Sequence, residues 1–191
     1  SSLLALLFIK SFLTSERFFK NKLHNFCNNK KNMPSKAFTE FRKNIADVDN
    51  LISSHRILNN GGRGKKGLGH ITRSGIVMLC ATWELYIESL LCESLEIILN
   101  RKTTPKDLPT IVKKTLVKLV KEDKHELKPI ELAGNGWRET LLNYAKTETE
   151  LLHTPKSTKL DLLYKRYLGM PEFSSLWSTS SSDLDDFVGK R

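Results

Sequence analysis

The sequence predicts an all-α protein, a bundle of five to six helices built around one long central helix. Residues 73–99 contain no proline and are apolar on most sides, as is typical of a helix in the middle of a bundle. Shorter segments before and after them carry apolar residues at three- and four-residue spacing, which is the period of a helix. The sequence shows no sustained alternation of apolar and polar residues, the pattern that would indicate strands.

Length and composition predict one domain at residues 33–191, preceded by a doubtful N-terminal segment. A chain of 191 residues with 39% hydrophobic residues can bury one substantial core. Residues 1–33 carry six Lys or Arg and one Asp or Glu, so they hold half of the net charge of +10. One hypothesis is that native translation begins at Met33 and that residues 1–32 come from an extended reading frame. The alternative is a disordered or loosely attached basic arm.

The first helix of the bundle is expected to begin after Ser35, whose side chain can cap it, and to end near Asn59. Its apolar positions are Phe38, Phe41, Ile45, Val48, Leu51, Ile52 and Ile57. The Gly-rich basic segment 61–69 that follows is expected to be a solvated connector. It lacks the G-x-x-x-x-G-K-[ST] form of a phosphate-binding loop.

A membrane span is the rival interpretation of residues 73–99. Arg73 and four glutamates interrupt the segment, so no run approaches the ~20 apolar residues that a bilayer requires. We therefore expect no association with a membrane. Glu84 lies between Trp83 and Leu85 in the most apolar turn of this helix, where a carboxylate requires a partner.

Four further helices are expected in the second half of the chain. Their caps are predicted to be Thr110, Asn135, Ser157 and Ser182, the last in a capping box with Asp185. The helix after Thr110 has an apolar side made of Ile111, Val112, Leu116, Val117, Leu119 and Val120. Its other side holds Lys113, Lys114, Lys118 and Lys121. Such a stripe is either a solvated face or a surface that holds an RNA backbone through phosphate contacts.

The common catalytic and metal-binding motifs are missing. The sequence contains no H-E-x-x-H, no G-x-S-x-G and no paired Cys ligands. None of the five histidines stands at metal-ligand spacing from another, so we expect no metal site and no cofactor. Cys27, Cys80 and Cys92 form no C-x-x-C pair and are expected to be reduced residues of a cytoplasmic protein, with Cys80 and Cys92 in its core.

Two stretches of the chain resemble a known family. The block W-E-L-Y-I-E-S-L-L at residues 83–91 resembles the second long helix of HEPN domains of the RiboL-PSP group. The segment T-P-K-S-T-K-L-D-L-L-Y-K-R-Y-L-G-M-P-E-F, from Thr154 to Phe173, resembles the connector before the last helix of that fold. The resemblance extends over residues 36–191. It implies a HEPN-like bundle and a homodimer in which Arg and His residues of two protomers cleave RNA without a metal.

Arg191 stands where the resemblance places the motif Arg, and the sequence ends there. The family pattern then expects a His four to six residues later, so we expect that the domain is truncated at its C-terminal motif. The pairs Arg17 with His24 and Arg63 with His70 both have Arg-x6-His spacing. Because both lie outside the expected last helix, we interpret them as accidental.

The resemblance assigns a catalytic role to Arg191, because a guanidinium can stabilise charge on the phosphoryl oxygens. The alternative is a helix-terminal cation that interacts with the helix dipole. Glu84 can reach an Arg on the last helix and fix its direction. Alternatively, it forms an ion pair within the fold with Arg73 or Arg138. Arg73 is also a candidate RNA-binding residue.

We therefore expect a metal-independent endoribonuclease of the toxin or phage-defence type that acts on RNA as a homodimer. An antitoxin or another protein is a possible partner. The competing interpretation is a HEPN module without catalysis that binds RNA or nucleotides or mediates dimerisation. A His within six positions after Arg191 would favour the enzyme.

Overall fold

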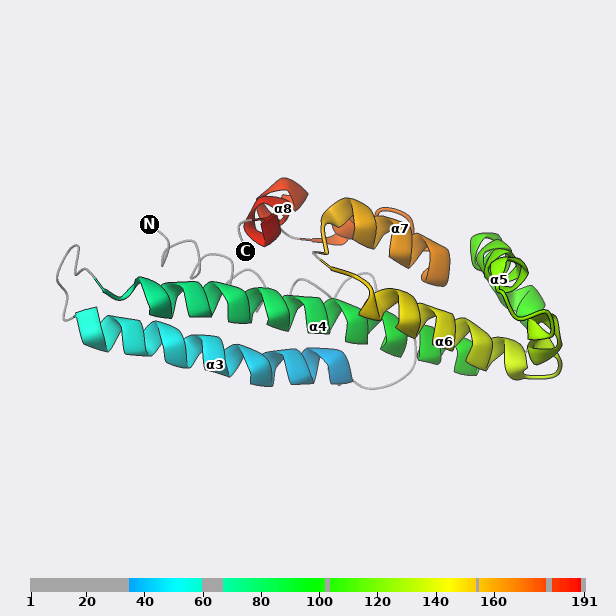
Figure 1. The fold of residues 1–191 in the computed structure, drawn as a ribbon, viewed down its shortest axis with the longest axis horizontal. Helices are drawn as coiled ribbons and strands as arrows, with labels where there is room; N and C mark the ends of the chain where they lie inside the picture. The colour runs from blue at the N-terminus through cyan, green and yellow to red at the C-terminus, as the bar shows by residue number, and fades with distance from the viewer. Residues whose placement is uncertain (1–34, 60–66, 102–103, 154, 178–179, 190–191) are drawn as a thin grey trace. The chain divides into compact units, whose positions relative to one another are not determined.

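The structure, a computed structural model, describes residues 35–59, 67–101, 104–153, 155–177 and 180–189. Within these residues the chain forms six α-helices, three short 3-10 helices and no strand, which confirms the predicted all-α class. The α-helices, labelled as in Figure 1, are α3 (Lys36–Asn59), α4 (Gly69–Arg101), α5 (Thr110–Glu122), α6 (Gly136–Glu150), α7 (Ser157–Leu168) and α8 (Ser181–Gly189). The 3-10 helices are η2 (Pro105–Asp107), η3 (Lys128–Leu132) and η4 (Phe173–Leu176). The predicted segment 1–32 and its boundary at Met33 lie outside the described residues.

The predicted central helix is confirmed as α4, a single helix of 33 residues. At 1.5 Å per residue it extends about 50 Å. In the part of the chain that the structure describes, it is the one helix long and apolar enough to cross a membrane, by length and composition only. Half of its most apolar window is buried inside the fold. Packing against other helices therefore accounts for much of its apolar character.

Helix α4 passes through two compact units. The first unit comprises residues 1–86 and 176–191, and it holds α3, the N-terminal part of α4 and α8. The second unit comprises residues 87–175, and it holds the C-terminal part of α4 together with α5, α6 and α7.

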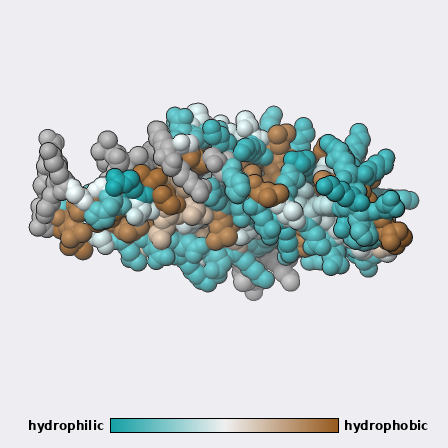
Figure 2. Space-filling model, in the orientation of Figure 1, coloured by the Kyte–Doolittle hydropathy of each residue, from teal (hydrophilic) through white to brown (hydrophobic). Residues whose placement is uncertain are grey.

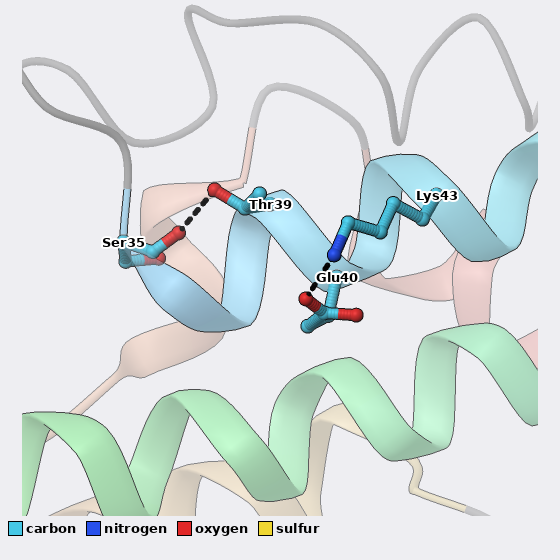
Figure 3. A network of polar contacts seen from close by, with 4 residues as sticks. All are labelled: Ser35, Thr39, Glu40 and Lys43. Atoms are coloured by element: carbon cyan, nitrogen blue, oxygen red, sulfur yellow. Dashed lines mark hydrogen bonds and ion pairs between the residues drawn. The ribbon is translucent and has the colours of Figure 1, made fainter.

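Ser35 starts α3 as predicted. The amide of Phe38 donates a hydrogen bond to Ser35 Oγ over 3.1 Å, which satisfies one of the free N–H groups of the first turn. The hydroxyl of Thr39 also donates to the Ser35 carbonyl, at 3.0 Å (Figure 3). One turn later Lys43 pairs with Glu40 at 2.6 Å on the exposed face (Figure 3).

In the first unit, α3 packs antiparallel to α4 through most of its predicted apolar positions. Its buried residues are Ala37, Phe41, Ile45, Val48 and Ile52. The ring of Phe41, near the start of α3, lies 4.7 Å from the ring of Tyr86 in the middle of α4. The prediction for Ile57 is wrong, because this residue lies in the last turn of α3 and is 72% exposed.

Helix α8 is held in the first unit by apolar contacts. The ring of Trp177, just before α8, meets the ring of Trp83 edge-on at 5.9 Å. The helix itself buries Leu184, Phe187 and Val188. Helix α8, the last described helix, therefore packs in the same unit as Trp83 of α4.

In the second unit, α6 lies alongside the C-terminal part of α4 and runs antiparallel to it (Figure 1). Near the start of α6, Arg138 Nε donates to the Leu99 carbonyl at 3.2 Å. Near its end, Thr149 shares a hydrogen bond with Cys92. Two contacts in opposite order along the two helices fix this direction.

Helix α7 contacts α4 and closely approaches the start of α5 in the second unit. The hydroxyl of Tyr164 donates to the Ile87 carbonyl at 3.1 Å, and its ring stacks on Phe173 at 3.7 Å. Gly169 ends α7 at φ +68, and its α-carbon faces Pro109, the residue before α5. A side chain at Gly169 would place its Cβ 2.7 Å from Pro109 Cβ, so the approach of α7 to α5 depends on this glycine.

Three of the four predicted caps are displaced by one or two residues. The N-caps of α5 and α7 are Pro109 and Lys156, so Thr110 and Ser157 are the first helical residues instead. Helix α8 begins at Ser181, and Ser180 Oγ accepts the amide of Ser182 at 3.2 Å. Asn135 does stand at the N-cap of α6, but its side chain makes no capping hydrogen bond and accepts from Arg138. Displacements of one or two residues are common at helix ends, where the last turns fray.

Candidate RNA-binding face and catalytic end

The structure brings the four predicted RNA-binding lysines together on one face of α5. Lys113, Lys114, Lys118 and Lys121 line a shallow hollow of about 430 Å³, together with Val117 and Glu122. Hydrophilic side chains crowd the region of α5 in Figure 2. We call these six residues the lysine face.

The opposite side of α5 fixes the orientation of the lysine face. Val112, Leu116 and Val120 are buried at three- and four-residue spacing, as predicted. Lys114, Lys118 and Lys121 follow the complementary spacing and form a column about 10 Å long. The amphipathic pattern of the sequence is therefore sufficient to direct the cations outward.

The four lysines differ in their contacts. Lys113 donates to the Lys106 carbonyl at 3.1 Å, and Lys118 lies 3.8 Å from Glu122. Lys114 and Lys121 are both exposed. These two cations are the best placed to meet an anionic ligand.

Val117 lies within the lysine face. It was predicted to belong to the apolar side of α5, but it is 48% exposed and lines the hollow. The prediction is wrong because Val117 lies about 100° around the helix from the centre of the buried stripe of α5. The face therefore offers an apolar surface surrounded by cations, which suits a ligand with both charged and apolar groups.

Arg73 and Glu84 both lie on α4 in the first unit. The side chain of Arg73 is exposed, and that of Glu84 is half-buried. Eleven residues separate them, which is about 16 Å along the helix axis, so they cannot form an ion pair within one chain. Arg138 was the other proposed partner of Glu84, and its Nε is bound to the Leu99 carbonyl in the second unit.

The predicted catalytic Arg191 lies outside the described residues, two residues beyond the end of α8 at Gly189. Helix α8 belongs to the same unit as Glu84. The contact between Glu84 and Arg191 stays a prediction. The same is true of the roles of Arg73 and the lysine face in binding RNA.

The second unit contains a polar cluster that the sequence did not indicate. Tyr167 donates to Glu148 Oε2 at 2.7 Å, and Arg166 pairs with the other oxygen of this carboxylate. Burial and the bond to Glu148 raise the pKa of Tyr167 well above its usual value. The phenol therefore stays protonated and acts as a donor that joins α7 to α6. Because the residues are 19 positions apart, no local pattern announces this cluster.

Another cluster surrounds the end of α5. Asp123 accepts the amide of His125 at 3.0 Å and the hydroxyl of Tyr144 at 2.7 Å. These two bonds lower the pKa of Asp123 below its usual value. Burial and the bond to Asp123 raise the pKa of Tyr144. The carboxylate thus fixes the turn that connects α5 with η3.

The segment Thr154 to Phe173, which carried the family resemblance, has a clear structural role. Asp161 on α7 accepts the amide of Ser174 at 2.6 Å and its hydroxyl at 2.8 Å. This carboxylate therefore ties the start of η4 back onto α7. The segment therefore organises the turn after α7.

No metal-binding cluster of three or more His, Cys, Asp or Glu occurs within the described ranges of the chain. His70 Nδ1 lies 2.7 Å from the Gly67 carbonyl, while Arg17, His24 and Arg63 lie outside the described residues. Cys80 is a buried free thiol. Cys92 is free and only half-buried, and burial raises the pKa of its thiol.

Comparison with known protein families gives a match over most of the chain. Residues 43–191 match the family model described as RiboL-PSP-HEPN. Comparisons with curated proteins and with solved structures give no match. The matched region includes every α-helix from α4 to α8 and most of α3.

Proposed function

The chain belongs to the RiboL-PSP-HEPN family, and from this membership we propose that it is a metal-independent endoribonuclease that acts as a homodimer. The family match over residues 43–191 carries the proposal. HEPN modules are generally related to ribonucleases, and the lysine face of α5 provides cations for an RNA backbone. We further propose a cytoplasmic toxin or phage-defence role, with an antitoxin or another protein as a regulatory partner.

In the proposed reaction the ribose 2′-oxygen bonds to the adjacent phosphorus while the bond from phosphorus to the 5′-oxygen breaks. The product chain then ends in a 2′,3′-cyclic phosphate. Arg191 stabilises the charge that develops on the phosphoryl oxygens, because its guanidinium offers two parallel donors. A histidine takes the proton from the 2′-hydroxyl and returns one to the leaving oxygen. Glu84 positions the guanidinium.

The lysine face has a separate role in this proposal. It contributes affinity through phosphate contacts, which carry no sequence information by themselves. Val117 supplies an apolar surface between the cations where a base or ribose can rest. Arg73 adds a further cation from the first unit.

The test is cleavage of a mixed RNA pool by the protein with its natural C-terminal sequence, with and without EDTA. We compare the parent with Arg191→Ala, Glu84→Gln and the matched control Arg42→Ala, which alters an exposed Arg of α3. Arg191→Ala should reduce the cleavage rate by on the order of 100-fold, as expected when a donor to a developing anion is lost. Glu84→Gln should reduce it less, and Arg42→Ala should leave it unchanged.

Each outcome separates the alternatives. Equal cleavage by the parent and Arg191→Ala would remove Arg191 from the site. Loss of cleavage in EDTA would contradict the metal-independent mechanism. RNA binding by the parent without any cleavage would favour the non-catalytic HEPN module.

A further inference from the structure

We propose that the exposed apolar stripe of α4 is the surface through which two copies of this chain pair, as antiparallel helices about a two-fold axis. This inference rests on the homodimer of the proposed function and assigns the surface that forms it. The stripe consists of Val77, Met78, Ala81 and Leu85, all in the first unit. We call it the α4 stripe.

The α4 stripe is unusual because α4 is otherwise the main core helix. Val77, Met78 and Leu85 are 52%, 38% and 51% exposed, and Ala81 between them is also exposed. At 100° per residue, the four positions fall within an arc of about 100° on one side of the helix. Large apolar side chains gathered on one face are typical of an interaction site.

The order of large and small residues suits self-pairing. If two α4 helices cross antiparallel about an axis midway between Met78 and Ala81, each Met78 lies opposite Ala81 of the partner subunit. A flexible thioether then fills the space that a small side chain leaves open. A two-fold axis creates this contact twice, because it pairs the same patch with itself.

The charges at the ends of the stripe are complementary in the same arrangement. Arg73 precedes the stripe and Glu84 lies near its far end, and helix geometry places both on the same edge of it. A two-fold axis keeps this edge on one side of both copies. Arg73 then lies about 3 Å along the axis from Glu84 of the partner subunit, close enough for an ion pair. Within one chain the same two residues are about 16 Å apart, so the pairing requires a second copy.

The first experiment measures the mass of the full chain by sedimentation in RNA-free buffer over a range of micromolar concentrations. The parent should reach twice 21.8 kDa. Leu85→Asp should weaken association by on the order of a hundredfold, because each dimer contains the substituted side chain twice. Leu162→Asp is the matched control, because Leu162 on α7 is similarly exposed, at 59%, and lies in the second unit. Circular dichroism of each variant verifies that it is folded.

The second experiment tests the register of the pair. Arg73→Glu and Glu84→Arg should each weaken association when alone, because like charges then meet across the axis. An equimolar mixture of the two variants should form heterodimers, because every contact at the ends of the stripe becomes complementary again. If either residue served only the fold of its own chain, mixing the two variants would not restore association.

Four results would overturn the inference: a parent that stays monomeric, equal weakening by Leu162→Asp and Leu85→Asp, no rescue on mixing, or binding of the parent to anionic lipid vesicles without a doubled mass. The proposed function fails separately, since no RNA is present in these experiments. A dimer that pairs through the α4 stripe but cuts no RNA supports this inference and contradicts the nuclease. A monomer that cuts RNA in EDTA contradicts this inference and the proposed homodimer, and supports only the metal-independent nuclease.

Discussion

Replacing Lys114 and Lys121 of the lysine face by Gln tests whether α5 holds an RNA backbone. These two residues are exposed, whereas Lys113 and Lys118 have contacts within the protein, to the Lys106 carbonyl and to Glu122. The substitution removes two positive charges from the exposed face while it keeps side chains of similar length. It leaves the buried stripe of α5 untouched, so the helix should stay folded.

The expected magnitude follows from counterion release. For single-stranded RNA the logarithm of the binding constant falls with the logarithm of the salt concentration by about 0.7 per phosphate contact. If the four lysines of the face each make one contact, the parent has a slope of about −3. Between 50 and 200 mM salt its affinity should fall by about fiftyfold, and that of the double variant by only about sevenfold.

The assay is fluorescence anisotropy of a labelled single strand that carries 2′-O-methyl groups, so that binding is measured without cleavage. The matched control is Lys36→Gln with Lys43→Gln on α3, which changes the net charge equally but lies in the first unit. An unchanged salt slope in the Lys114 and Lys121 variant would refute the role of the lysine face. An equal reduction in the control variant would show that net charge alone determines the affinity.

Two further predictions concern the packing that positions α5. Gly169→Ala should cost about 3 kcal/mol, because Ala is strained at φ +68 and its methyl carbon would lie 2.7 Å from Pro109 Cβ. Its melting temperature should therefore fall by roughly 6–12 °C, and a melt that matches the parent would contradict this packing. Asp123→Asn should destabilise the protein at neutral pH, because Asp123 has a lowered pKa in the folded state and its carboxylate stabilises the fold only when ionised. The difference in unfolding free energy between the parent and Asp123→Asn should be complete above pH ~5 and shrink as the pH falls below about 4; a difference that stays constant with pH would exclude the carboxylate charge as its cause.

The helical content of this protein follows from local sequence patterns. The cap at Ser35 and the apolar spacing of α3 predict its start and its buried side, because the first turn and the helical period involve residues only a few positions apart. The length and even apolarity of residues 73–99 predict a central helix for the same reason. The amphipathic pattern of α5 also predicts which way its lysines point.

Helix boundaries and the exposure of single residues depend on tertiary contacts. Thr110 and Ser157 have good capping side chains, yet the preceding residues are the N-caps of α5 and α7. Near Thr110 the chain is held by the close approach of Gly169 to Pro109, a contact between positions 60 residues apart. Ile57 is apolar and correctly spaced, but the end of α3 leaves it exposed.

The sequence by itself determined the family, the helices and the cationic side of α5, because each depends on residue types at short spacing. Only the tertiary structure decided that Val77, Met78 and Leu85 stay exposed on a helix whose other large apolar residues are mostly buried. It also decided that the Glu148 carboxylate joins Tyr167 to α6. Whether a residue is buried depends on segments that are far apart in the sequence. A helical pattern shows only which side of a helix can pack against another helix. Which faces receive a neighbour is settled when the helices pack.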